Sequence, residues 1–187
     1  MLEPNIREQI IELIHRQVVP AVGCTEPMAV ALCAARATEL LGEKPEKVSV
    51  LLSANILKNA MGVGIPGTGM IGLPIAIALG VLIGRSDYRL EVIKDLTPES
   101  LEAGKRFIGE DRIDIKLKEG ITEKLYIEVC CETAGHCATA VISGSRSRRQ
   151  RSSVSVRQTR PRAWRAMKLI ASGVTKSAAI SRSPSFS

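Results

Sequence analysis

The feature that most constrains this chain is a run of residues without any charge, from Ala60 to Gly84. The run holds seven glycines and two prolines among 25 residues, and its compact apolar part, Met70–Ile83, is 14 residues long. A bilayer-spanning helix needs about 20 mainly apolar residues. We therefore expect a buried core helix over Met70–Ile83, preceded by a glycine loop, and no membrane partner.

Periodicity and capping residues predict the remaining elements. A helix that is apolar almost all round is expected from about Thr25 to Leu41, with Thr25 able to cap it, Pro27 in its first turn and Gly42 ending it. The other expected helices are Ile6–Val18 and a polar helix from Thr97 through Phe107. The expected strands are Lys47–Ser53, Leu90–Ile93, Arg112–Leu117, Lys124–Cys131 and Ala138–Ile142.

These elements predict an α+β fold in three parts. Residues 1–89 form a mainly helical, glycine-rich part, and residues 90–144 form a small α/β sandwich-like part. Residues 145–187 contain 11 serines and nine arginines among 43 residues and no acid, so we expect a disordered basic tail. Exposed apolar faces on the helices also predict aggregation or homo-oligomers.

The net charge of +7 comes entirely from that tail. Residues 1–144 carry 15 basic against 19 acidic residues, whereas the tail carries 11 basic residues and no acidic one. One interpretation is an arm that contacts nucleic acid. The other, which we favour, is a reading-frame accident, because the composition changes abruptly after the strand-like segment ATAVISGS. We accordingly expect no nucleic-acid partner.

Cysteine usage indicates a reducing compartment. The five cysteines are an odd number, and no basic and apolar leader opens the chain, so we expect a cytoplasmic protein. Cys24, in PAVGCTEP, stands just before the expected helix, where the positive end of the helix dipole favours a thiolate. It is a metal ligand or nucleophile, or else it fills space in a turn. Cys33 falls on the opposite helix face and is expected in the core.

The remaining cysteines give a weaker signal for a metal. Cys130 and Cys131 are neighbours on an expected strand, so their side chains point to opposite faces. Together with His136 and Cys137 they show no CxxC pattern, and we favour ordinary half-buried thiols over a zinc site.

The glycine loop and the segment before it could hold an anion. Its glycines satisfy GxGxxG, but the polar segment NILKN intervenes after the preceding strand, which argues against a dinucleotide fold. Exposed backbone N–H groups of a loop that leads into a helix still suit a carboxylate or phosphate. The candidates are Gly67, Thr68 and Gly69 in the loop, with Asn55, Lys58 and Asn59 facing it. Alternatively, the loop only lets helices pack closely and Lys58 is solvated.

Three blocks in this order, PAVGCTEP, NILKNAMGVGIPGTGMIGLPIAIALG and EVIKDLTPE, resemble the L-cysteine desulfidase family, which is related to the alpha subunit of iron-sulfur L-serine dehydratases. The resemblance covers residues 1–144. It implies a 4Fe-4S lyase that converts L-cysteine or L-serine to pyruvate and ammonia, with sulfide or water as the other product. It also implies that Cys24 is the first cluster ligand, that Lys58 is a candidate base, and that the substrate-binding residues include Thr25 and Glu26.

The chain departs from the family pattern at its end. Family members are much longer, and their other cluster cysteines lie in a C-terminal region without a counterpart here. We therefore expect a truncated chain that is inactive alone, with the remaining ligands of the 4Fe-4S cluster absent. The alternative function is a non-catalytic binding module whose basic tail contacts nucleic acid.

Overall fold

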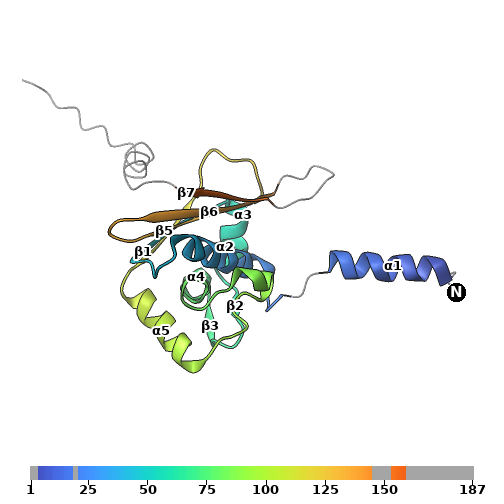
Figure 1. The fold of residues 1–187 in the computed structure, drawn as a ribbon, viewed down its shortest axis with the longest axis horizontal. Coiled ribbons are helices and arrows are strands. Elements are labelled where there is room, and N and C mark those ends of the chain that lie inside the picture. Colours follow the sequence, from blue (N-terminus) through green and yellow to red (C-terminus); the bar gives the residue numbers. More distant parts are fainter. Residues whose placement is uncertain (1–3, 19–20, 145–152, 159–187) are drawn as a thin grey trace, which may run out of the picture.

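The computed structural model describes residues 4–18, 21–144 and 153–158 (Figure 1). The helices are α1 (Pro4–Gln17), α2 (Thr25–Leu41), α3 (Ala54–Ala60), α4 (Leu73–Leu82), the 3₁₀ helix η1 (Ser86–Glu91) and α5 (Pro98–Gly109). The strands are β1 (Lys47–Leu52), β2 (Gly64–Ile65), β3 (Met70–Ile71), β4 (Ile113–Leu117), β5 (Leu125–Glu132), β6 (Cys137–Gly144) and β7 (Ser153–Gln158). The predicted α+β class, with helices dominating the first part and strands the second, is confirmed.

One five-stranded sheet has the order β4-β1-β5-β6-β7. β1 runs parallel to β4 and antiparallel to β5, and β6 pairs antiparallel with both β5 and β7. β1 comes from residues 1–89, yet it lies between two strands from residues 90–144. The two predicted parts therefore share one sheet and one core.

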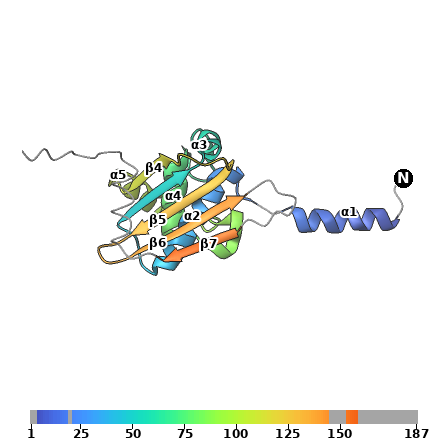
Figure 2. The same ribbon diagram turned by 90° about the horizontal axis from the view of Figure 1, so that it is seen from above.

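The helices α2, α4 and α5 cover one face of this sheet in successive layers (Figures 1 and 2). α2 lies against β5 and β6, α4 packs on the other side of α2, and α5 packs on α4. The sheet-facing residues of α2 follow helical spacing: Val30, Cys33, Ala34 and Ala37. On the opposite side, Met28, Ala31 and Ala35 pack with α4. This double burial explains why α2 is apolar nearly all round.

α4 is the core helix expected in the uncharged run. Its side chains from Leu73 to Leu79 are almost all fully buried. A Cβ added at Gly80 would lie 2.5 Å from the carbonyl oxygen of Ala31, so glycine permits the close approach of α4 to α2. Within the described ranges, none of the helices is both long and apolar enough to cross a bilayer.

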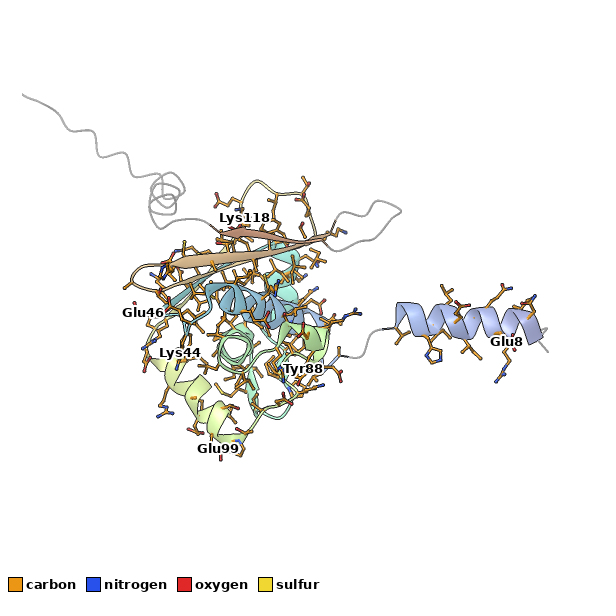
Figure 3. All side chains as sticks on the ribbon, in the orientation of Figure 1. Glu8, Lys44, Glu46, Tyr88, Glu99 and Lys118 are labelled. Carbon is orange, nitrogen blue, oxygen red and sulfur yellow. The ribbon has the colours of Figure 1, made fainter. Side chains whose placement is uncertain are left out.

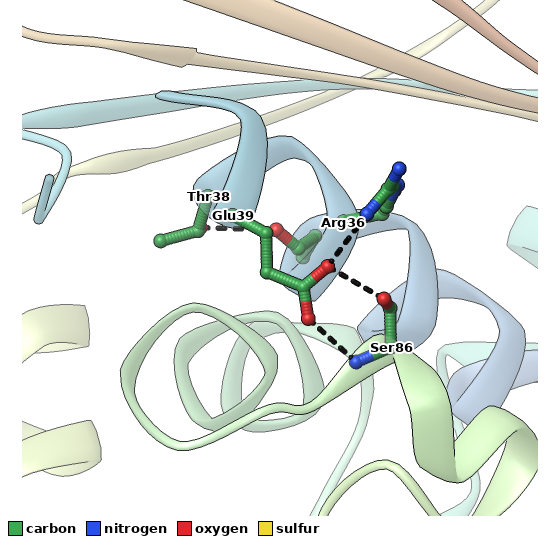
Figure 4. Close-up of polar contacts among 5 residues, drawn as sticks. Arg36, Thr38, Glu39 and Ser86 are labelled. Carbon is green, nitrogen blue, oxygen red and sulfur yellow. Dashed lines mark hydrogen bonds and ion pairs between the residues drawn. The ribbon is translucent and has the colours of Figure 1, made fainter. Parts of the chain in front are cut away.

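A polar clasp fixes η1 to α2 (Figure 4). The carboxylate of Glu39 accepts hydrogen bonds from the backbone N–H of Ser86, at 2.8 Å, and from its hydroxyl. Arg36 pairs with the same carboxylate at 3.1 Å. Partial burial would raise the pKa of Glu39, but the hydrogen bonds from Ser86 and Arg36 lower it overall. The segment that follows α4 is thereby held against α2.

Two predicted elements are wrong in part. The helix expected over Met70–Ile83 begins only at Leu73, because Gly72 has a φ of 90° and the two preceding residues pair with β2 in a hairpin. The strand expected over Leu90–Ile93 is absent; these residues complete η1 and the turn after it. Its apolar side chains, Val92 and Ile93, are buried against α2 and α4 rather than paired in a sheet.

One of the observed strands was not predicted from the sequence. Ser153–Gln158, inside the basic stretch, forms β7 and pairs with β6 from Ala138 to Ser143. The rest of the predicted tail lies outside the described residues.

Candidate functional site

Cys24 occupies the turn that leads into α2. It is the N-cap residue of the helix, with an extended backbone and no side-chain capping bond, and it is exposed. The prediction that Thr25 caps this helix is wrong, because Thr25 is already the first helical residue. The Cys24 thiol therefore stands at the helix N-terminus, as the sequence indicated. Cys24 is one residue closer to the helix than expected, because it is the N-cap itself.

A glycine joins this turn to the hairpin formed by β2 and β3. Gly23 has a φ of +79°, and a Cβ there would lie 2.7 Å from Cγ of Pro66. Both the backbone conformation and the contact exclude a side chain at this position. The turn is also braced from behind, because the N–H of Val22 donates to the carbonyl of Leu90 at 3.1 Å. The Cys24 turn and the glycine hairpin, more than 40 residues apart in the sequence, thus lie in contact.

A carboxylate from the first turn of α2 is held beside Cys24. Asn59 of α3 donates its side-chain N–H to Oε1 of Glu26 at 3.4 Å, and the Thr25 hydroxyl donates to Oε2 at 3.0 Å. Glu26 is half-buried, and the helix dipole favours a negative charge at this end of α2. The contact between Glu26 and Asn59 was not foreseen, although both were candidate substrate-binding residues.

The predicted hairpin residues divide into two groups. Gly67 and Gly69 are exposed at the tip, with φ values of +76° and +65°. Thr68 is buried; its hydroxyl donates to the carbonyl of Ile65 at 2.7 Å and accepts from the N–H of Met70 at 3.0 Å. The Thr68 side chain therefore stabilises the hairpin, and the glycine backbone is the part that solvent can reach.

The remaining candidates lie on α3. This helix starts at the N-cap Ser53, whose hydroxyl accepts from the N–H of Ile56, and it buries Ile56 and Ala60. Asn55 and Lys58 are exposed on the same helix as Asn59. Neither makes a side-chain hydrogen bond or ion pair with another described residue, so both are accessible to a small molecule.

The other cysteines belong to the core. Cys33 is fully buried and its Sγ lies 3.3 Å from the carbonyl oxygen of Ala140; burial raises its pKa. Burial likewise raises the pKa of Cys130 and of Cys131 to about 12. As predicted, these two point to opposite faces: Cys131 contacts Thr38 of α2, at 3.6 Å, and Cys130 contacts Glu132. Cys137 is also buried.

This distribution does not fit a complete iron-sulfur cluster. Such a cluster takes three or four thiolate ligands at one place. Among residues 4–18, 21–144 and 153–158, no group of three or more His, Cys, Asp or Glu residues is arranged to hold a metal ion. Cys24 is the one exposed thiol in these ranges and supplies at most one ligand.

The fold and the site define an α+β protein with an exposed thiol at a helix N-terminus, set against a glycine hairpin. Over 138 residues, the chain is 75% identical to a UPF0597 protein of Bacteroides fragilis and 70% identical to one of Bacteroides thetaiotaomicron. Over 143 residues it is 69% identical to a UPF0597 protein of Phocaeicola vulgatus. These matches cover 74–76% of this chain but only 32–33% of each relative, so the chain spans about a third of their length.

The assignment to the L-cysteine desulfidase family is therefore wrong. The relatives with 48–75% identity carry the name UPF0597, and neither a desulfidase nor a serine dehydratase name occurs among them. No family model matches the chain. No solved structure matches it either. Short glycine-rich and GCTEP-like blocks were thus insufficient to assign the family.

Proposed function

We propose that this chain carries the thiol-bearing part of a cytoplasmic lyase site that acts on L-cysteine or L-serine. The observation that supports the proposal is the contact of the Cys24 turn with the glycine hairpin through Gly23 and Pro66. Because of this contact, an accessible thiol, a held carboxylate and exposed backbone amides lie on neighbouring elements.

Each group has a role that suits a small amino acid. The Glu26 carboxylate, held by Asn59, suits the substrate ammonium. The exposed backbone N–H groups of Gly67 and Gly69 suit the substrate carboxylate. Lys58 is exposed and is the candidate base. In the reaction, the base takes the α-proton and the Cβ–S or Cβ–O bond breaks with its electron pair leaving on sulfur or oxygen. Water then hydrolyses the resulting enamine to pyruvate and ammonia.

The 4Fe-4S cofactor remains a prediction that the described residues do not complete. Cys24 would provide one ligand, and the other ligands would have to come from polypeptide outside the described residues. We accordingly expect the chain to bind its substrate but to form no pyruvate alone.

Calorimetric titration of L-cysteine and of L-serine into the purified full chain tests the proposal. We expect binding of one of them, weakened at least about tenfold by Asn59→Ala, because Glu26 loses one of the two groups that hold it, the one from α3. Gln9→Ala is the matched control, since this amide lies on α1 and bonds only to Asn5 among the described residues. Folded protein that binds neither amino acid, or an Asn59→Ala variant that binds like the wild type, would overturn the proposal.

The alternative, a binding module with a basic nucleic-acid-contacting tail, gains no contact from the structure. Apart from β7, the tail lies outside the described residues. Deleting residues 145–187 tests it, because that deletion would abolish salt-dependent binding to nucleic acid and would leave amino-acid binding unchanged.

A further inference from the structure

α1 presents an apolar face that no other described element covers. Figures 1 and 2 show the helix standing away from the sheet and the other helices. Figure 3 shows its side chains, Glu8 among them, projecting without reaching the rest of the molecule. The large apolar residues are 38–49% exposed: Ile6, Ile10, Ile11, Leu13 and Ile14. A large part of the apolar surface of this helix is therefore in water.

We propose that this face docks into an apolar groove of the polypeptide that the UPF0597 relatives possess beyond the segment matched here. The matched segment accounts for about a third of those relatives. It is 75% identical to the corresponding segment in Bacteroides fragilis, where about twice as much further polypeptide is present in the same molecule. The proposal is independent of the lyase function.

The width of the face argues for a groove and against a second copy of α1. At about 100° per residue, the five apolar side chains spread over an arc of about 160°, with Arg7 the only charged residue inside it. A two-helix pair buries a narrower seam and would leave Ile11 and Ile14 exposed. In addition, a pair of 14-residue helices is too short to be stable by itself.

The charge of α1 argues against a membrane surface. The segment Pro4–Gln17 contains two arginines and two glutamates, so it carries no net positive charge. Helices that lie on anionic membranes are rich in Lys and Arg on their polar face. By helical spacing, the polar face here carries Glu8 and Glu12 beside a single arginine, Arg16.

Co-expression of the full chain with the remaining polypeptide of the Bacteroides fragilis relative, carrying an affinity tag, tests the proposal. We expect the two to copurify in a one-to-one complex. The double variant Ile10→Glu/Leu13→Glu should lower recovery of the chain at least about tenfold, because it places charge in the buried face. The matched control is Glu8→Ala/Glu12→Ala, which changes two residues of the polar face and should leave recovery unchanged.

The intact relative gives a second measurement that does not depend on the isolated remainder folding. Glutamates at the two positions aligned with Ile10 and Leu13 should lower its Tm by about 5 °C or more, whereas the same change should leave the Tm of this chain nearly unaltered. An intact relative that melts like its wild type would overturn the proposal. So would a dimer of this chain that the double variant dissociates, or sedimentation of the chain with phosphatidylserine vesicles.

Discussion

Cys24 and Cys33 stand nine residues apart, at the start and in the middle of α2, and have opposite surroundings. Cys24 is exposed at the N-cap, next to the glycine hairpin. Cys33 is fully buried between α2 and the sheet, its Sγ directed at the carbonyl of Ala140. The same residue type thus serves two purposes on one helix: an accessible thiol at its end and a small apolar filler in its body.

The difference shows that the body and the first turn of α2 have separate roles. Its body is buried on two sides, which holds the helix rigidly between the sheet and α4. Its first turn emerges at the surface and carries Cys24, Thr25 and Glu26. A rigid element that presents its terminus to solvent positions reactive groups better than a free loop does. Changes in the body should therefore affect folding, and changes at the end should affect chemistry.

The largest effect is expected where α4 meets the body of α2. Gly80→Val introduces a Cβ that would lie 2.5 Å from the Ala31 carbonyl oxygen, so the helices must separate. We expect the free energy of unfolding to fall by about 3 kcal/mol, measured by urea denaturation. Gly62→Ala is the control, since a Cβ there has no neighbour within 4 Å. Equal stability of the two variants would contradict the packing described here.

A smaller loss is expected for the buried thiol itself. Cys33→Ser replaces a fully buried sulfur with a hydroxyl in an apolar environment, and we expect a loss of about 2 kcal/mol in the free energy of unfolding. The hydroxyl can still donate to the Ala140 carbonyl, which limits the loss. If Cys33→Ser and the wild type denatured at the same urea concentration, the buried Cys33 would contribute no more to stability than the exposed Cys24.

Alkaline pH should destabilise the fold through the buried thiols, Cys33 among them. Burial raises the pKa of Cys33, and it raises the pKa of Cys131 to about 12, whereas unfolded thiols ionise near pH 8.5. Only the unfolded chain then releases these protons. Stability is therefore constant below about pH 8 and falls above about pH 9, by up to about 1.4 kcal/mol per pH unit for each thiol.

Urea denaturation between pH 7 and 10 measures this slope. Cys131→Ala should flatten it, since that variant removes one of the protons released on unfolding. Tyr126, whose pKa burial also raises, adds to the slope only above about pH 10. A stability that rises with pH in this window would contradict the burial of the thiols.

Much of this architecture could be predicted from the sequence because local signals agreed with packing. α2 spans the predicted residues Thr25–Leu41, although its cap is Cys24 rather than Thr25, and periodicity placed Cys33 in the core. The failures lie where tertiary contacts decide. No local sequence signal indicated that the apolar Val92 and Ile93 pack in a turn rather than in a strand. Likewise, nothing in the basic stretch indicated that β7 would pair with β6.

The candidate site residues could be named from the sequence, but their arrangement could not be predicted. Cys24, Glu26, Asn59 and the hairpin glycines were all candidates, and the structure brings their segments together. The contact between the Cys24 turn and the hairpin depends on Gly23 meeting Pro66, which are 43 positions apart in the chain. A glycine just before a cysteine and a helix is a usable signal for such a close approach, but it does not indicate the partner.

The smallest effect on stability is expected at the exposed thiol of Cys24. Cys24→Ser changes an exposed N-cap residue to one that caps helices well, so the free energy of unfolding should change by less than about 0.5 kcal/mol. The same variant should abolish rapid alkylation of native protein by iodoacetamide at pH 8, because the other four cysteines are buried. Cys130→Ser, as the control, should leave that labelling intact, and mass spectrometry identifies the modified peptide. Fast alkylation of a second thiol in the folded chain would mean that exposure does not separate Cys24 from the cysteines of the core.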